Sequence, residues 1–144
     1  MISEQFKHLG IQFVLNLDGA LPRPVGNTYK FEQVIVNLII NAKDAIEEKV
    51  HIMNTDFNKV VKISSYHKNH HVYVEVQDNG IGIEPKDLDK VMLPFYSTKK
   101  EGVGTGLGLS ISFGIIRDMN GTIDIQSERL EGTTIKIMVP VKKD

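Results

Sequence analysis

Three polar side chains are spaced so that they would share one face of a helix. Asn37, Asn41 and Asp44 stand at positions i, i+4 and i+7, beside a stripe of apolar residues. An asparagine carbonyl oxygen suits Mg²⁺, which needs few protein ligands once it is bound to phosphates. Asparagine is a poor helix former, so the repeat needs a reason. Taken alone, the pair is still better explained as the polar edge of an amphipathic helix.

A second candidate group lies just past a predicted strand, Val72–Val76. Asp78 opens the sequence Asp-Asn-Gly-Ile-Gly, which ends at Gly82. A buried carboxylate can accept a hydrogen bond from an adenine amino group, and the wrong base leaves it unpaired at a cost. Gly80 and Gly82 would let the backbone approach a flat ring. Asp-Asn-Gly is also typical of an ordinary turn, and alone it favours that interpretation.

Alternating glycines form a third group: Gly102, Gly104, Gly106 and Gly108. The spacing does not fit a dinucleotide-binding fingerprint, and the Gly-Lys-Ser/Thr of a Walker A loop is absent. What remains is a glycine loop that leads into a predicted helix, where free backbone N–H groups suit anionic phosphates. Leu107, Leu109 and Ile111 follow at once with core-forming side chains, which disfavours a plain linker.

The segment Leu93–Glu101 lies between the two glycine-containing groups. It contains Phe95 and Tyr96, followed by the polar run Ser-Thr-Lys-Lys. Lys99 could reach a γ-phosphate, whereas Lys100 is interpreted as a solvated lysine. Few apolar side chains follow Tyr96, so we expect the stretch from Leu93 to Gly104 to be mobile in the empty protein and to become ordered with ATP.

The elements that must position these groups form a mixed α/β pattern. Predicted strands cover Ile11–Leu17, Val60–Ser65, Val72–Val76, Thr122–Ser127 and Thr133–Val139. Predicted helices run from Asn27 or Thr28 to Val50, from Glu84 to Val91 and from Gly106 to Met119. Because strands and helices do not simply alternate, a doubly wound parallel sheet is disfavoured. We predict an α+β fold, a two-layer α/β sandwich whose mixed sheet of about five strands carries about three helices on one face.

Composition limits the other classes. The chain has 144 residues, a net charge of −1 and no cysteine. One domain of this size can bury a single core. We expect no nucleic-acid surface and no direct membrane contact, since no basic cluster indicates either. No apolar run approaches the roughly 20 residues that cross a bilayer, and the N-terminus lacks signal-peptide character, so we expect a cytoplasmic domain.

Four segments in fixed order together resemble one known family. Asn37–Ala42, Asp78–Gly82, Pro94–Lys99 and Gly102–Gly108 resemble the N, G1, F and G2 boxes of the ATP-binding domain of two-component sensor histidine kinases. The wider clan includes DNA gyrase, mismatch-repair ATPases and heat-shock chaperones. The resemblance spans Ile11 to Pro140 and implies a Bergerat-type ATP-binding fold.

The resemblance implies ATP and Mg²⁺ as cofactors. Asn41 matches the residue that holds the magnesium, and Asp78 matches the residue that reads adenine. Asn37, Asn41 and Lys99 form the implied catalytic set. The other implied nucleotide contacts are Gly80, Gly82, Phe95, Gly104, Gly106, Leu107, Gly108 and Thr133. For Thr133, an ordinary β-branched strand residue is an equally good explanation.

Two departures from the clan matter. Asp44 stands where many histidine kinases carry lysine, and Lys43 points about 200° away from Asn41 around the helix. A basic contact to phosphate must therefore come from elsewhere, for example from Lys99. The hydrolysing ATPases place a glutamate base where this chain has Asn37, and an amide cannot deprotonate water. This favours a kinase over an ATPase.

No histidine of the chain lies in the phosphoacceptor motif of the family. His67, His70 and His71 cluster at a predicted turn, where a solvated turn is favoured over a metal site because no carboxylate or cysteine joins them. We therefore interpret residues 1–10, with His8, as a linker from a missing upstream domain and residues 11–144 as the catalytic domain.

The expected partners are ATP, the upstream dimerisation and phosphoacceptor domain, and a response regulator. Three alternatives stay open at this point: an anti-sigma-type serine kinase, a clan ATPase, and a nucleotide-binding module that regulates a partner without chemistry. A membrane anchor elsewhere in the parent protein is compatible with all of them.

Overall fold

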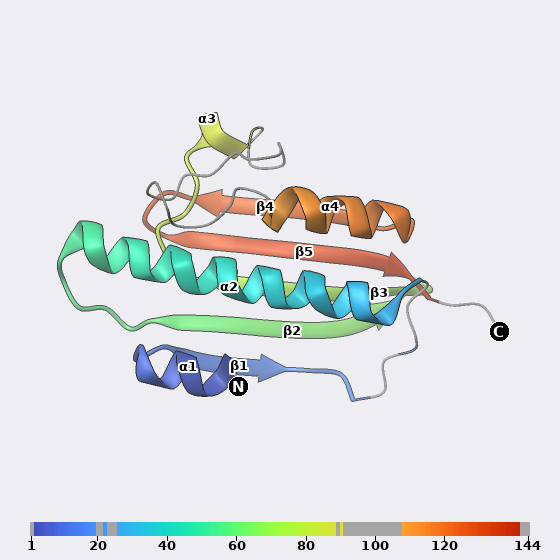
Figure 1. Cartoon of the computed structure of the whole chain (residues 1–144), viewed down its shortest axis with the longest axis horizontal. Helices are drawn as coiled ribbons and strands as arrows, with labels where there is room; N and C mark the ends of the chain where they lie inside the picture. Colours follow the sequence, from blue (N-terminus) through green and yellow to red (C-terminus); the bar gives the residue numbers. More distant parts are fainter. Residues whose placement is uncertain (1, 20–21, 23–25, 89, 91–107, 142–144) are drawn as a thin grey trace.

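A five-stranded mixed sheet forms one layer of the protein in a computed structural model (Figure 1). The structure describes residues 2–19, 22, 26–88, 90 and 108–141. The strands are β1 (Gln12–Asn16), β2 (Val60–Lys68), β3 (His71–Asp78), β4 (Thr122–Glu128) and β5 (Gly132–Pro140). Their spatial order is β1-β2-β3-β5-β4, in which only the β1–β2 pairing is parallel.

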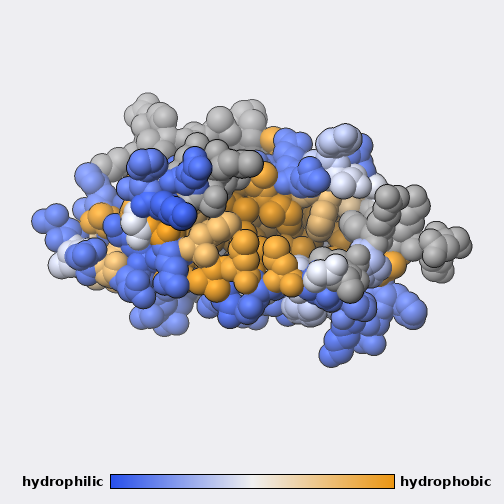
Figure 2. Space-filling view, turned by 90° about the horizontal axis from the view of Figure 1, so that it is seen from below, coloured by the Kyte–Doolittle hydropathy of each residue, from blue (hydrophilic) through white to orange (hydrophobic). Residues whose placement is uncertain are grey.

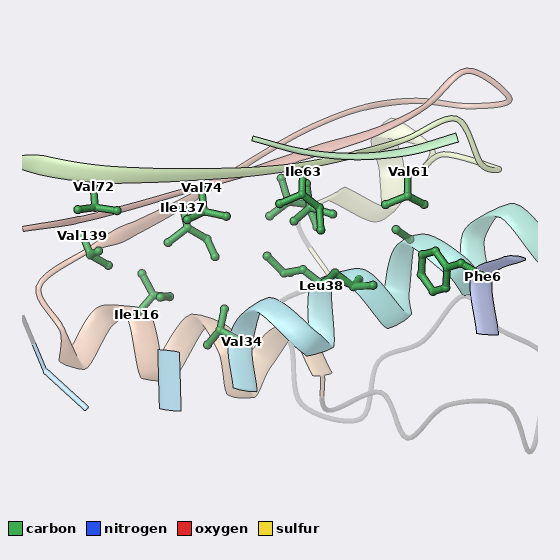
Figure 3. Packing of buried hydrophobic residues seen from close by; sticks show 14 of the residues in the cluster. Phe6, Val34, Leu38, Val61, Ile63, Val72, Val74, Ile116, Ile137 and Val139 are labelled. Carbon is green, nitrogen blue, oxygen red and sulfur yellow. The ribbon is translucent and has the colours of Figure 1, made fainter. Parts of the chain in front are cut away.

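The second layer consists of helices on one face of this sheet (Figures 1 and 3). The described helices are α1 (Ile2–His8), α2 (Thr28–Met53), α3 (Pro85–Leu88) and α4 (Gly108–Asp118). α2 crosses over between the parallel strands β1 and β2, and α4 packs beside it. The predicted α+β class with a mixed sheet covered on one face is confirmed. None of the helices described is long and apolar enough to cross a bilayer.

α2 begins and ends at residues with recognisable caps. The Asn27 side chain accepts a hydrogen bond from the Lys30 amide at 3.1 Å, so Asn27 is the N-cap. At the other end Asn54 adopts the left-handed conformation, and its amide donates to the Val50 carbonyl. No glycine or proline interrupts the helix before Asn54, which explains why it extends past the predicted end at Val50.

The core lies between α2, α4 and the inner face of the sheet. Alternate residues of β2, β3 and β5 point toward the helices, and Figure 3 shows them against α2 and α4. The fully buried side chains include Val34, Leu38, Val61, Ile116 and Ile137. This alternation fixes the register, because a slip of one residue would turn every inward side chain outward.

The histidine cluster lies at the hairpin between β2 and β3. Asn69 and His70 both have positive φ, which makes the tight two-residue turn that matches the twist of the strands. The strands are longer than predicted, so His67 lies in β2. Contrary to the sequence interpretation, a carboxylate does join the cluster, since Asp18 Oδ2 lies 3.2 Å from His67 Nδ1. Among the described residues no group of three potential metal ligands occurs.

Residues 2–8, interpreted from the sequence as part of a linker, form the helix α1. Phe6 is 1% exposed and belongs to the core, with its ring edge-on to Phe13 of β1 at a centroid distance of 5.1 Å. The chain then reverses through Gly10, and the Ile11 amide donates to the Phe6 carbonyl. β1 is an edge strand of the sheet. Figure 2, which views the molecule from below relative to Figure 1, shows apolar surface among hydrophilic residues.

Candidate functional site

Asp78 is the last residue of β3 and is 8% exposed. Its side chain lies on the inner face of the sheet, as Val76 and Val74 do, and its Oδ1 accepts a hydrogen bond from the Gly80 amide at 2.8 Å. Burial raises the pKa of this carboxyl to about 7, opposed in part by the amides of Gly80 and Thr133 and by the charge of Lys49. A desolvated carboxyl with a strongly perturbed pKa is typical of a functional site.

The loop that follows Asp78 is docked on α2. The Ile81 amide donates to the Ala45 carbonyl at 3.0 Å. A Cβ on Gly80 would lie 2.6 Å from the backbone carbon of Ala45, so no side chain fits there. Gly82 has φ +73°, and a Cβ there would meet the Glu128 carbonyl. The missing side chains at these two glycines make room for protein backbone, and the predicted approach of a ligand ring to them stays a prediction.

Thr133 of β5 lies directly opposite Asp78 in the antiparallel ladder. It is buried, and its Oγ1 lies 2.7 Å from Ser127 Oγ on β4. Ser127 also accepts from the Ile83 amide at 2.7 Å and donates to the Gly132 carbonyl at 3.0 Å. The structure therefore brings together two of the predicted site residues, Asp78 and Thr133, and supports them with a serine that the sequence analysis missed.

One transverse row of the sheet contains these residues. Phe13 pairs with Val61, Val61 with Asp78, Asp78 with Thr133, and Thr133 with Ser127. The row crosses all five strands, and Asp78 occupies its centre. The polar part of the row lies on β3, β5 and β4, while the β1–β2 part is apolar.

α2 contributes the asparagines. Asn37 and Asn41 are both half-buried. Asn41 lies one helical turn before Ala45, the residue whose carbonyl binds the loop, so both belong to the row of α2 that faces Asp78–Gly82. Asp44 lies 3.4 Å from Lys43 Nζ, and Lys43 also approaches Glu47. Both carboxylate contacts of Lys43 lie on α2 itself.

Lys49 is a second residue that the sequence analysis missed. It is a lysine at a position where the apolar stripe of α2 predicts a core residue, and it is 9% exposed. Its Nζ donates to the Asn79 carbonyl at 3.0 Å and lies 4.5 Å from the centroid of the Phe57 ring. A charged residue on an otherwise apolar stripe was the signal that could have revealed it.

A pocket of about 250 Å³ adjoins the loop. Its lining combines acidic and basic side chains with the loop backbone: Glu48, Ile81, Gly82, Ile83, Glu84, Lys86, Asp87 and Arg129. Glu84 lies 3.3 Å from Lys86 and 3.8 Å from Arg129, so two basic side chains of the pocket wall pair with it.

Several predicted site residues lie outside the described part of the chain: Phe95, Lys99, Gly104, Gly106 and Leu107. Gly108 is the first residue of α4. The predicted helix start at Gly106, the end of the predicted helix at Val91 and the whole of Leu93–Glu101 fall in the same undescribed ranges.

Comparison with known proteins gives one family and a consistent set of relatives. The model described as "Histidine kinase-, DNA gyrase B-, and HSP90-like ATPase" matches residues 26–143. The sensor kinase CckA of Brucella abortus is 42% identical over 117 residues, which cover 77% of this chain and 12% of that protein. Sporulation kinase E of Bacillus subtilis is 31% identical over 144 residues, which cover 100% of this chain and 18% of that protein.

A solved structure shows the same architecture. The nucleotide-free catalytic domain of histidine kinase ThkA is 30% identical and has a TM-score of 0.78, with 97% of this chain and 85% of that chain covered. The chain thus spans most of that isolated domain but only a small part of the full-length relatives.

Proposed function

Because the chain belongs to the family of histidine kinase-, DNA gyrase B- and HSP90-like ATPases, we propose that it binds Mg-ATP and donates the γ-phosphoryl group to a histidine of its parent protein. The observation that carries this proposal is the buried Asp78, which pairs with Thr133 in the β3–β5 ladder and is followed by a loop that docks on α2 at Ala45, one turn after Asn41. In this proposal Asp78 supplies the acceptor for a base, and Asn41 supplies the hard oxygen donor for a phosphate-bound metal.

Each described residue has a distinct role in this proposal. Asp78 accepts the hydrogen bond from the exocyclic amine of adenine, and Thr133 lines the same pocket wall. Asn41 would offer its side-chain oxygen to Mg²⁺, and the ion would supply positive charge against the phosphates. Phe95, Lys99 and the glycines from Gly104 to Gly108 are proposed to complete the phosphate side. Catalysis then consists mainly of positioning and charge neutralisation.

Two observations support a kinase over the alternatives. Asn37 occupies the position at which a hydrolysing ATPase would need a base, and an amide cannot serve as one. The relatives named above are sensor and sporulation kinases, which supports a histidine kinase over an anti-sigma-type serine kinase or a regulatory module without chemistry. We propose that the acceptor histidine lies on an upstream dimerisation domain joined through residues 1–10, that a cytoplasmic response regulator receives the phosphoryl group, and that this domain itself is cytoplasmic.

Replacing Asn41 tests the metal role. Asn41→Ala should weaken the binding of ATP in the presence of Mg²⁺ by about tenfold, because a ligand of the ion is lost, and should leave metal-free ADP binding nearly unchanged. Calorimetric titration with Mg²⁺ and with a chelator measures both. Gln33→Ala, at an exposed position on the same helix, is the matched control. An equal loss in the two conditions would mean that Asn41 has only a structural role.

The proposed phosphoryl transfer can be tested with this chain alone and with the acceptor domain added. Incubated alone with γ-labelled ATP, the protein should not label any of its five histidines, and hydrolysis should be slow. Added to a separately prepared upstream domain from the parent protein, it should label that domain on histidine. Acid lability of the label identifies the phosphoramidate. Rapid hydrolysis, or stable label on this chain, would contradict the proposal.

A further inference from the structure

Lys49 is a buried cation whose ammonium has defined partners. Its Nζ donates to the Asn79 carbonyl at 3.0 Å and lies over the Phe57 ring, with the residue only 9% exposed. Withdrawing an ammonium from water is costly unless its partners compensate. A methionine or leucine would fill the same stripe of α2 without that cost, so packing alone does not explain a lysine here.

Asn79, the residue whose carbonyl binds Lys49, is also hydrogen-bonded to the start of β2 and the residues before it. The Asn79 side chain accepts from the Val60 amide at 2.9 Å and donates to the Asn58 carbonyl at 2.5 Å. Asn79 therefore ties the loop after β3 to the start of β2, and Lys49 ties the same residue to α2. The loop is held from two sides at one residue.

Lys49 continues the helical row that contains the other contacts of the site. Asn41, Ala45 and Lys49 follow one another at intervals of four residues along α2. Ala45 binds the loop at the Ile81 amide, and Lys49 binds it at the Asn79 carbonyl. Two hydrogen bonds one turn apart fix how far along the helix the loop lies. The same helix carries Asn41, so they also fix the position of Asp78 relative to Asn41.

We propose that Lys49 is a positioning residue that holds the Asp78–Gly82 loop against α2 and thereby sets the spacing between the adenine acceptor and the metal ligand. This inference rests on the proposed function, in which Asp78 reads adenine and Asn41 binds Mg²⁺. Lys49 touches neither the nucleotide nor the reacting atoms in this account. It acts through Asn79 and through its charge.

Besides holding the loop through its hydrogen bond, Lys49 favours the ionised form of Asp78 through its charge. Among the described residues, Lys49 on α2 is the charged group that acts on Asp78, while the loop and β5 contribute the Gly80 and Thr133 amides. All three lower the pKa of the carboxyl against the effect of burial. The charged side chains of the adjoining pocket, Glu48, Glu84, Lys86, Asp87 and Arg129, face the later part of the loop. Lys49 therefore favours the ionised acceptor.

Nucleotide titrations of three lysine variants test this role. Lys49→Met keeps the length of the side chain and removes the ammonium. It should weaken Mg-ATP binding by about tenfold, because the nucleotide would then have to order the loop that the Lys49–Asn79 hydrogen bond holds in the empty protein. The pH at which binding reaches half its maximal strength should also move upward. Lys49→Arg should restore most of the affinity, because it keeps a charged donor. The matched control Lys43→Met, on the same helix, should bind as the unmodified protein does. Unchanged affinity and pH profile in Lys49→Met would overturn the proposal.

A measurement without nucleotide separates this inference from the proposed function. In Lys49→Met the amides of Gly80 and Ile81 should exchange at least tenfold faster, while those of Val74 and Val76 in β3 keep their protection. If the methionine variant does not fold, Lys49→Gln serves in the same comparison. Unchanged exchange at Gly80 and Ile81 would overturn the positioning role even if ATP binds. If the unmodified protein bound no nucleotide, the proposed function would fail, and faster exchange would then show only a structural clamp.

Discussion

Asp78→Asn is expected to weaken ATP binding by about 1–3 kcal/mol and to make the empty protein more stable above pH 7. The amide keeps the shape of the side chain but loses an acceptor at a desolvated contact. The gain in stability has a separate cause. The carboxyl has a pKa raised to about 7 in the folded protein, so the folded state binds a proton more tightly than the unfolded chain.

The sign of the pH dependence follows from this raised pKa. The contribution of Asp78 to stability is fully present below the pKa of the unfolded carboxyl, near 3.8, and is lost as the pH rises toward about 7. Asp78→Asn removes this loss, so the free energy of unfolding of the variant relative to the unmodified protein should increase between pH 5 and pH 8. Urea unfolding at both values measures the difference, and Asp124→Asn, at an exposed position on β4, is the control.

ATP affinity should show the opposite trend. The ionised carboxylate is the stronger acceptor, so the ratio of the affinity of the unmodified protein to that of Asp78→Asn should rise between pH 6 and pH 8. Taking the ratio cancels the titration of the ATP phosphates. A ratio that does not change with pH, together with equal affinity for ATP and GTP, would remove Asp78 from the adenine site.

The second large effect is expected at Gly132, where β5 begins. Its φ is +139°, and a Cβ there would lie 2.0 Å from the Asp78 carbonyl oxygen. Gly132→Ala combines an unfavourable backbone conformation with a collision against backbone, so we expect a loss of about 3 kcal/mol or more in the free energy of unfolding. Any variant that folds should also lose ATP affinity, because the end of β3 must move.

The control for Gly132 is another glycine in a helix. Gly114 lies in α4, and a Cβ there would meet no atom within 4 Å. Gly114→Ala should therefore stabilise the protein by about 0.5–1 kcal/mol through the helix propensity of alanine. Urea unfolding of both variants gives the comparison. A loss below 1 kcal/mol for Gly132→Ala would show that the start of β5 can relax away from Asp78.

The sequence was sufficient where local signals and the core pattern agree. The sequence predicted that α2 begins at Asn27 or Thr28, and the structure has Asn27 as the cap. The alternation in β3 and β5 was predicted too, although the strand ending at Val76 stopped short of Asp78. The tight turn at Asn69 and His70 follows from the same local chemistry. In each case the signal lies within a few residues of the feature that it predicts, so no knowledge of distant contacts is needed.

Features that depend on contacts between distant segments were not predictable in this way. α1 has only seven residues, which is too short for a clear helical periodicity in the sequence. It is anchored by the burial of Phe6 against Phe13, a contact that exists only in the folded protein. Lys49 bonds Asn79, 30 residues away, and Ser127 bonds Ile83, 44 residues away, so both contacts exist only in the folded protein. Gly80 is required by the backbone of Ala45, a neighbour that sequence spacing does not reveal.

The transverse row from Phe13 to Ser127 has a mechanical consequence for how motion could enter this domain. α1 is fastened to β1 through Phe6 and Phe13, and only β2 separates β1 from β3. A rotation of α1 would therefore move the edge strand β1, which lies two strands from β3 and Asp78. The hydrogen-bonded pairings β1–β2 and β2–β3 would transmit this movement to Asp78. Torque on the chain before β1 and the ionisation of Asp78, the proposed adenine acceptor, would then be linked through the sheet itself.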